Sequence, residues 1–330
     1  MEHYFLGVES TAHTFSVSVV SSIGRICSNT KSVYKPAKGS GIHPFEASQS
    51  HLRHATSVLE EAIERSGIAI TGLEAICYSM GPGLGPCLRV GAVVARTLAT
   101  ELNKPLVPVN HAVGHIELGC LLTGARDPLV LLVSGGHTMV IAFSGGRWRV
   151  LGESLDLTLG QLLDQFGRHS GFASPCGAAI ESAASKSATY HKLPYSVKGN
   201  DVSFSGLLTA AKKLVDSGKS LESVSFSIQE TAFAMIAEVV ERALAFTGKR
   251  EILVVGGVAA NQRLSEMMSL MASRHAASVS VTPVSYSGDC GAQIAWTGIL
   301  AHSKGIEVSV GKADIRQSWR LDTVDIPWRN

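Results

Sequence analysis

Residues 130–143 read VLLVSGGHTMVIAF, an apolar run followed by a short turn of small residues and a returning apolar strand. Residues 4–20, YFLGVESTAHTFSVSVV, repeat this design, with His13-Thr14 corresponding to His137-Thr138. A hairpin of one design that recurs after about 125 residues indicates two homologous lobes, each opening with a phosphate-facing turn. Two unrelated hairpins are the alternative, because glycine and serine are common in turns.

The turn of the second hairpin predicts an anion site. Glycines directly after a buried strand let the backbone turn sharply and present N–H groups to an anion, usually a phosphate. Here the strand is 129–132 and the turn is 134–136. Residues 251–263, EILVVGGVAANQR, offer another place where backbone amides can meet a nucleotide, although the same pattern fits an ordinary strand–turn–helix.

Two histidines precede this hairpin, and they predict a metal site. His111 and His115 are spaced i and i+4, which on a helix puts both imidazoles on one face, within reach of one ion. Two imidazoles and one carboxylate with open coordination positions suit iron(II) or zinc in a site that binds substrate. Asp289 lies at a turn before an apolar helix, where an N-cap is its ordinary role. For the histidines, satisfied polar residues at a lobe interface are the alternative.

Composition narrows the class of protein. A chain of 330 residues with 45% hydrophobic residues and 33 glycines is typical of a compact α/β enzyme with two lobes around a cleft, not of a disordered chain. Its net charge of +2 means that nucleic-acid contact needs a local basic patch or a partner. The six scattered cysteines indicate reduced, mostly buried thiols. With neither a signal peptide nor a membrane span in the sequence, we expect a cytoplasmic protein.

Several segments leave two interpretations open. Residues 156–168 predict a helix with Gly160 inside it, which close approach of a ligand or another helix would explain, and its Asp164 faces the cleft or solvent. The loop 80–86, MGPGLGP, lines a ligand cleft or forms a tight strand-to-helix turn. The amphipathic helices expected near 45–66 and 87–101 fill the lobe's own core or dock a small partner.

Six segments taken together resemble the universal tRNA threonylcarbamoyladenosine transferase family, once labelled O-sialoglycoprotein endopeptidases. They are NHAVGHIELG, LLVSGGHT, LDLTLGQLLDQFGR, VKGNDVSFSG, VVGGVAANQRLSEMM and YSGDCGAQIAWTG, and they fall in the family's order along nearly the whole chain. The resemblance implies the actin, sugar-kinase and heat-shock ATPase superfamily fold, with two ribonuclease-H-like lobes around a nucleotide cleft. We expect the first lobe at 1–125, with 295–330 packing back on it, and the second at 126–294.

The resemblance also implies the reaction. The threonylcarbamoyl group of threonylcarbamoyl-AMP passes to the exocyclic amine of the tRNA adenosine 3′ of the anticodon, and AMP is released. The implied metal ligands are His111, His115 and Asp289. The positions that match the family's nucleotide contacts are Leu132, Val133, Ser134, Gly135 and Gly136 at the phosphate end, and Asp164, Gly177, Glu181 and Asn261 at the adenosine.

The chain departs from the family pattern at three positions. Leu132 stands where archaeal and eukaryotic members usually have a tyrosine that reaches the metal. A fourth protein ligand to the metal is therefore not expected from this position. His137 replaces a usual asparagine, and Cys176 a common glycine. A metallopeptidase is disfavoured, because HAVGH lacks the glutamate of HExxH and Glu117 lies off that face. An ATP-binding regulatory or scaffold subunit would not need the metal triad.

Partners follow from the resemblance. Archaeal and eukaryotic members act in the KEOPS assembly with a kinase-like ATPase, a small dimerising subunit and a small tRNA-binding subunit. In some archaea the kinase is fused after this domain, so this chain is expected to be either the separate subunit or part of such a fusion. The metal is expected to be iron(II), with zinc as the alternative, and the bound nucleotide threonylcarbamoyl-AMP, ATP or AMP.

Overall fold

Two sheets of the same topology form the two halves of the chain in the computed structural model, which describes residues 2–37 and 39–329. The first has the order β3-β2-β1-β4-β5 and the second the order β12-β11-β6-β7-β8. In each, three consecutive antiparallel strands are followed by two parallel ones. This equivalence confirms the predicted duplication.

The strands of the first sheet are β1 (Tyr4–Glu9), β2 (Thr14–Ser21), β3 (Ile26–Val33), β4 (Leu73–Gly81) and β5 (Leu106–Asn110). Those of the second are β6 (Leu129–Val133), β7 (Thr138–Ser144), β8 (Arg147–Glu153), β11 (Glu251–Val255) and β12 (Ser278–Val281). The segment 197–206 contains the two-residue strands β9 (Val197–Lys198) and β10 (Asp201–Val202).

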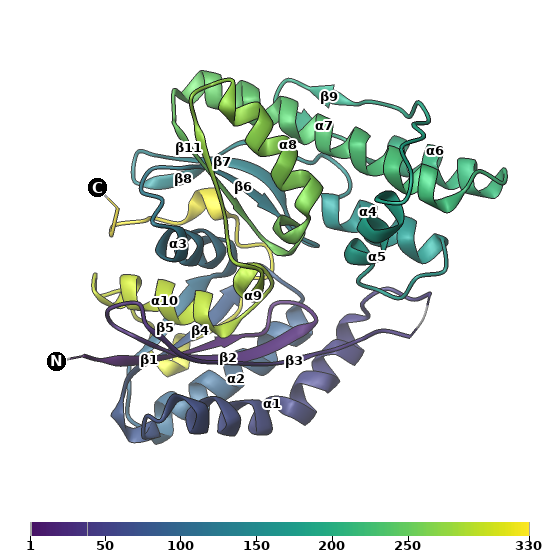
Figure 1. Cartoon of the computed structure of the whole chain (residues 1–330). Helices are drawn as coiled ribbons and strands as arrows, with labels where there is room; N and C mark the ends of the chain where they lie inside the picture. Colours follow the sequence, from purple (N-terminus) through teal and green to yellow (C-terminus); the bar gives the residue numbers. More distant parts are fainter. Residues whose placement is uncertain (1, 38, 330) are drawn as a thin grey trace.

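Helices cover both faces of each sheet (Figure 1). The outer face of the first sheet carries α1 (Pro44–Ser66) and α2 (Gly85–Glu101), and that of the second carries α4 (Leu159–His169), α5 (Gly177–Ala184), α6 (Ser205–Asp216), α7 (Leu221–Thr247) and α8 (Gln262–Ser273). Between the sheets lie α3 (His111–Thr123), α9 (Val284–Ser287) and α10 (Gly291–His302). The helices expected near 45–66 and 87–101 therefore form, and Gly67 ends α1 in the left-handed conformation that glycine adopts readily.

Close backbone packing fixes the start of α10, directly after Asp289. A Cβ on Gly291 would lie 2.5 Å from the backbone nitrogen of Ser18, so only glycine lets the helix approach the first sheet this closely. The Gly291 N–H also donates to Ser16 Oγ at 2.9 Å. Cys290 occupies the N-cap position of α10, so the alternative that Asp289 caps this helix is wrong.

The C-terminal segment runs across both halves. On the first, the Tyr78 hydroxyl donates to the Asp314 carbonyl at 3.1 Å. On the second, the Ile326 N–H donates to the Gly146 carbonyl at 2.9 Å, and Leu321 is buried against the sheet. Among the described residues all six cysteines are free, and no helix combines the length and apolar character that a membrane span needs.

Candidate metal and nucleotide site

Three side chains from two segments converge between the sheets. Asn110 caps α3 by accepting from two amides, which starts the helix at His111 and puts His115 one turn later. Asp289 Oδ1 lies 3.5 Å from His111 Nε2 and 3.4 Å from His115 Nε2. One ligand atom from each residue lies within 4.8 Å of the others. The structure thus brings together the three residues that the sequence proposed.

This cluster fits a divalent metal ion. Both histidines are buried, and His115 Nε2 has no hydrogen-bond partner within the described residues. A buried nitrogen without a partner is costly unless something outside the chain satisfies it. Two imidazoles and a carboxylate are a donor set used by zinc and iron(II) in sites that keep open positions.

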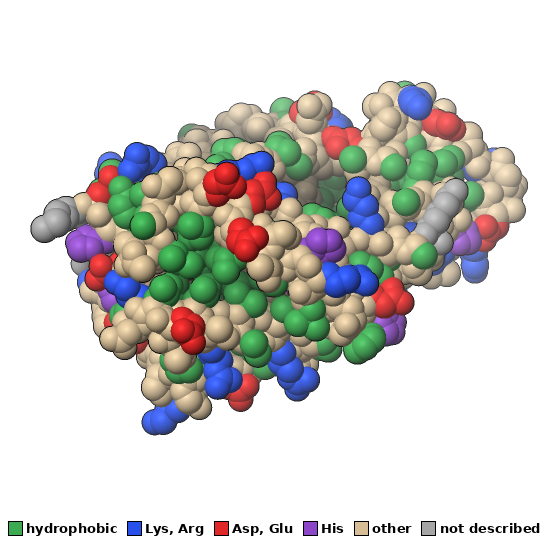
Figure 2. Space-filling model, turned by 90° about the horizontal axis from the view of Figure 1, so that it is seen from below, with side chains coloured by type: hydrophobic (Ala, Val, Ile, Leu, Met, Phe, Trp, Pro, Cys, Tyr) green, Lys and Arg blue, Asp and Glu red, His purple; other side chains and the backbone are tan. Residues whose placement is uncertain are grey.

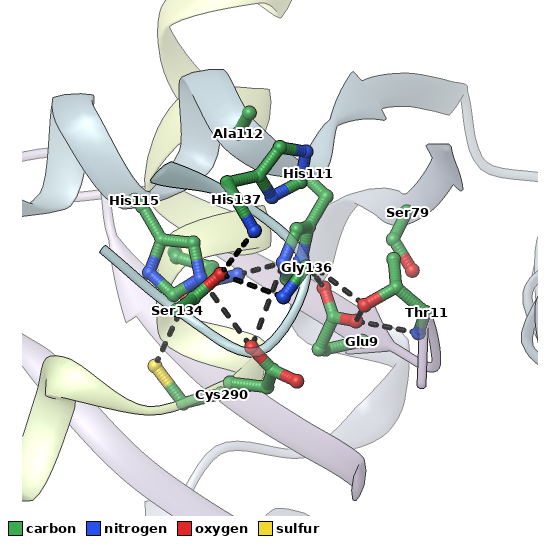
Figure 3. A network of polar contacts seen from close by, with 12 residues as sticks. Glu9, Thr11, Ser79, His111, Ala112, His115, Ser134, Gly136, His137 and Cys290 are labelled. Atoms are coloured by element: carbon green, nitrogen blue, oxygen red, sulfur yellow. Dashed lines mark hydrogen bonds and ion pairs between the residues drawn. The ribbon is translucent and has the colours of Figure 1, made fainter. Parts of the chain in front are cut away.

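A second set of side chains holds the first imidazole from behind (Figure 3). His111 Nδ1 lies 2.9 Å from Glu9 Oε2 and 3.0 Å from Gln293 Nε2. The other oxygen of Glu9 accepts from the amide and hydroxyl of Thr11, at 2.6 and 2.5 Å. Carboxylates that accept from the second nitrogen of a metal-binding histidine fix its ring orientation and raise its basicity. Glu9 was not among the residues predicted from the sequence, although an acid at the end of an apolar strand was a usable signal.

Burial and neighbouring charges shift the pKa values of the three imidazoles in opposite directions. Burial works against a charge on His111, but Glu9 and Asp289 raise its pKa to about 9. Burial lowers the pKa of His115, and burial together with the two neighbouring histidines lowers the pKa of His137 to about 3. Burial opposes ionisation of Asp289, but the close contact with His115 and the charge of His111 hold its pKa below the usual range. The site therefore presents an ionised Asp289, a protonated His111 and neutral imidazoles at His115 and His137, and a metal ion would have to displace a proton from His111.

The Ser-Gly-Gly turn lies next to this cluster and is partly satisfied by its own hydroxyl. Ser134 Oγ accepts from the amides of Gly136 and His137 at 3.1 and 3.0 Å, and the Ser134 N–H donates to the His137 carbonyl at 2.8 Å (Figure 3). Gly135 is exposed, and its N–H has no partner in the part of the chain that the structure describes. We expected three free amides in this turn. The groups left to bind an anion are the Gly135 N–H and the Ser134 hydroxyl.

The two residues before the turn contribute backbone only. Leu132 and Val133 are fully buried in β6, and the Leu132 side chain packs in the core between α3 and the second sheet.

Gly160 lets α4 approach the turn. A Cβ on Gly160 would lie 2.5 Å from the Ser134 carbonyl oxygen, and the Thr158 hydroxyl at the start of α4 donates to the Gly135 carbonyl at 3.0 Å. The sequence suggested a ligand or another helix close to this glycine; the structure shows instead that the close neighbour is the chain's own Ser-Gly-Gly turn.

The four residues matched to adenosine contacts lie on α4, α5 and the start of α8, in two connected pairs. Asp164 accepts from the amide of Cys176, the residue before Gly177, at 3.2 Å, and pairs with Arg168 at 3.0 Å. Asp164 is 24% exposed, so it is a partly buried side chain with two partners rather than a freely solvated one.

In the second pair, Glu181 accepts from the amide of Gln262 at 2.7 Å, directly after Asn261. The buried Asn261 caps α8 and donates to Gln229 at 3.1 Å. The adenosine positions of α5 and α8 are thus joined.

Comparison with known proteins assigns the chain to a family. A profile described as TsaD: tRNA N6-adenosine threonylcarbamoyltransferase matches residues 23–296. The chain belongs to this family. A tRNA N6-adenosine threonylcarbamoyltransferase of Caldivirga maquilingensis is 50% identical over 323 residues, which are 98% of this chain and 97% of the relative. One from Staphylothermus marinus is 49% identical over 336 residues, covering 98% of this chain and 99% of the relative.

Longer relatives and solved structures add two facts. A probable bifunctional tRNA threonylcarbamoyladenosine biosynthesis protein of Methanothermobacter thermautotrophicus is 48% identical over 98% of this chain, which spans 60% of that protein. The crystal structure of T. kodakarensis HypF superposes on 92% of this chain and 48% of its own, with a TM-score of 0.64 and 15% identity.

An activator of 2-hydroxyisocaproyl-CoA dehydratase from Clostridium difficile with bound ADPNP covers 92% of this chain and 97% of its own, with a TM-score of 0.53 and 12% identity. These similarities concern the fold, and they agree with the predicted superfamily of actin, sugar kinases and heat-shock ATPases.

Proposed function

We propose that this chain transfers the threonylcarbamoyl group of threonylcarbamoyl-AMP to the exocyclic amine of the adenosine 3′ of the anticodon. Its substrates are tRNAs that read codons beginning with A, and AMP is the second product. Membership of the TsaD family supports the reaction class. The observation that carries the proposal within the structure is the buried cluster of His111, His115 and Asp289 beside the exposed Ser-Gly-Gly turn.

In this reaction the amine nitrogen attacks the carbamoyl carbon. The new C–N bond forms, the bond from that carbon to the phosphate oxygen breaks, AMP leaves with the electron pair, and one amine proton passes to water. An aromatic amine is a poor nucleophile, so a bound metal would supply Lewis-acid activation of the carbamoyl or threonyl oxygens. His111, His115 and Asp289 would hold that metal, for which iron(II) is our first choice and zinc the alternative.

The remaining site residues would bind the adenylate. The Gly135 N–H and the Ser134 hydroxyl are placed to stabilise the phosphate as it becomes the leaving group. Leu132, Val133 and Gly136 shape this turn through their backbone. Asp164, Gly177, Glu181 and Asn261 would hold the adenosine on the second half of the chain. We take 1–125 as one lobe, with 295–330 packing back on it and its last residues crossing to the second sheet, and 126–294 as the other lobe, with the adenylate between them.

Glu117, the glutamate that follows the histidine pair, is not available as the general base of a peptidase. Glu117 is buried, accepts from Trp148 Nε1 at 3.1 Å and pairs with Arg329 at 2.9 Å. A carboxylate held in this way is a structural anchor.

Partner proteins would supply much of the tRNA-binding surface, because the chain itself is nearly neutral. We place this assembly in the cytoplasm. Figure 2, which views the molecule from the side of α1 and α2, shows hydrophobic side chains gathered on this face. Phe45, Leu52 and Val93 on these helices are 61%, 58% and 59% exposed. We expect this face to dock a small KEOPS subunit, with the kinase-like ATPase either separate or fused, as the longer relatives suggest.

The test is direct transfer. The full chain with KEOPS subunits is incubated with threonylcarbamoyl-AMP and an unmodified tRNA, and the digested nucleosides are analysed by mass spectrometry. We expect threonylcarbamoyladenosine with wild-type chain and a loss of at least about a hundredfold with His115→Ala, the upper range for losing an interaction in a metal site. A tRNA with guanosine at the target position is the control. Equal product from wild type and His115→Ala would contradict the proposal.

A further inference from the structure

A hollow of about 180 Å³ lies between His137, close to the metal-ligand cluster, and the C-terminal segment 318–321. The adenosine positions described above lie on other elements, α4, α5 and the start of α8, whereas the phosphate-facing turn 134–136 directly precedes His137 of the hollow. The residues that shape the hollow and matter for its chemistry are Pro82, His137, Met139, Val150, Trp319 and Arg320.

The wall formed by the C-terminal segment is held in place by hydrogen bonds. The Gly83 N–H donates to the Gln317 carbonyl at 3.1 Å, and Asn110 Nδ2 donates to the Trp319 carbonyl at 3.1 Å. Asn110 is the cap of α3, directly before the metal-ligand candidate His111. The same helix start therefore positions both the cluster and the indole of the hollow.

The chemistry of the walls selects a flat ring with a polar edge. Trp319, Met139 and Val150 offer aromatic and aliphatic surface. His137 offers the polar contact: its Nδ1 is buried and has no hydrogen-bond partner among residues 2–37 and 39–329. Its ring centroid lies 6.4 Å from that of His111, so a group bonded to His137 is next to the cluster. The Arg316 guanidinium lies over the Trp319 ring, 5.3 Å from its centroid, so a flat group would stack on the opposite face of the indole.

We propose that this hollow receives the adenine base that is modified, extruded from the RNA stack, with Trp319 as its stacking surface and His137 at its polar edge. The inference rests on the proposed function, because a transferase that acts on a base amine must bring that amine out of the stack to the cluster. Stacking on aromatic side chains is the general way in which proteins hold unstacked bases of RNA.

The threonyl end of the adenylate is a poorer occupant. It carries a carboxylate, and the cation on the wall, Arg320, already pairs with Asp322 at 3.1 Å and with Glu153 at 3.5 Å. Apolar walls would leave the remaining polar groups of that end without partners. A neutral aromatic base matches the lining better.

The experiment compares wild type, Trp319→Ala and Trp319→Phe in the full assembly, with KM for tRNA and KM for threonylcarbamoyl-AMP measured separately. We expect Trp319→Ala to raise KM for tRNA at least about tenfold, in the range seen for loss of one base–aromatic stack, and Trp319→Phe to stay within about threefold. KM for threonylcarbamoyl-AMP and metal content should not change. Val150→Phe, which fills the hollow from a different strand, should reproduce the effect if Trp319→Ala fails to fold.

Photo-crosslinking gives a readout independent of turnover. An anticodon stem-loop with 8-azidoadenosine at the target position should label a peptide that contains His137–Met139 or Ser318–Leu321. If wild type transfers the group and both Trp319→Ala and Val150→Phe keep an unchanged KM for tRNA, the inference is wrong but the proposed function stands. A raised KM for threonylcarbamoyl-AMP instead would assign the hollow to the threonyl end and also overturn it. No transfer by wild type would contradict the proposed function itself.

Discussion

Glu9 Oε2 lies 2.9 Å from His111 Nδ1, so a carboxylate with no exposed surface fixes the ring of a predicted metal ligand from behind. The opposite nitrogen, Nε2, lies toward Asp289. Glu9 is thus a positioning residue, and two hydrogen bonds from Thr11 hold it in turn. The first hairpin therefore supports the metal cluster, and the second hairpin carries the anion-facing turn.

Replacing Glu9 by glutamine should weaken metal binding while the fold remains. We expect a tenfold to hundredfold lower affinity, about the range for loss of an outer partner of a metal-binding histidine. Competition between the protein and a chelator for zinc measures it. The matched control is Glu181→Gln, the same change on α5, which should keep metal affinity and weaken adenine-nucleotide binding instead. Equal metal affinity in wild type and Glu9→Gln would show that Glu9 does not act on the site.

Gly160→Ala should destabilise the chain and loosen the anion turn. The added Cβ would meet the Ser134 carbonyl oxygen at 2.5 Å, and such overpacking typically costs about 1–3 kcal/mol. Without this contact, alanine would stabilise the helix by about 1 kcal/mol relative to glycine. A loss of stability therefore indicates the contact, and a gain indicates its absence. Gly206→Ala on α6 is the control, because its Cβ would have nothing within 4 Å. Urea unfolding and calorimetric AMP binding should show loss only for Gly160→Ala; a stabilised Gly160→Ala protein would refute the close contact.

The sequence was most informative where a pattern carries its own geometry. The repeated hairpin predicted the equivalent sheets, and the i, i+4 histidines predicted two imidazoles on one helix face. It could not show that Ser134 Oγ occupies the Gly136 amide, because a side chain bonded to its own turn leaves no periodic signal. Nor could it pair Glu9 with His111, since 102 residues separate them and only the folded sheet brings them together.

Acid should destabilise this protein partly through His51. Burial lowers the pKa of this α1 histidine to about 4, while Nε2 lies 3.0 Å from the Ala12 carbonyl. The unfolded chain takes up a proton below about pH 6.5 and the folded chain only near pH 4, so stability present above 6.5 is lost as the pH falls. Between pH 7 and 5 the loss should be about 2 kcal/mol.

His51→Gln, which keeps a donor for the same carbonyl, should remove that part of the pH dependence. Chemical unfolding of both proteins at pH 7 and pH 5 measures it, because the other histidines are common to both. A wild-type protein that loses no more stability than His51→Gln over this interval would show that His51 does not contribute.

The pair between Arg329 and Glu117 should anchor the C-terminal segment. Arg329 contacts Glu117 at 2.9 Å and its guanidinium lies 4.7 Å from the Trp148 ring centroid. Arg329→Met leaves a buried carboxylate without its cation, which typically costs about 3–5 kcal/mol. Arg147→Met is the control: its partner Asp325 is 77% exposed, and exposed pairs contribute about 0–1 kcal/mol. Thermal unfolding should separate the two variants clearly, and similar small losses would mean that the anchor contributes little.

Metal-dependent transfer tests the central claim most directly. The full chain is stripped with a chelator, titrated with iron(II), and assayed at each point for bound metal and for threonylcarbamoyl transfer to tRNA. We predict that transfer is lost on stripping and returns in proportion to one metal per chain, and that His111→Ala/His115→Ala protein regains neither metal nor transfer. Full transfer by stripped protein, or one bound metal per chain without the two histidines, would contradict the account.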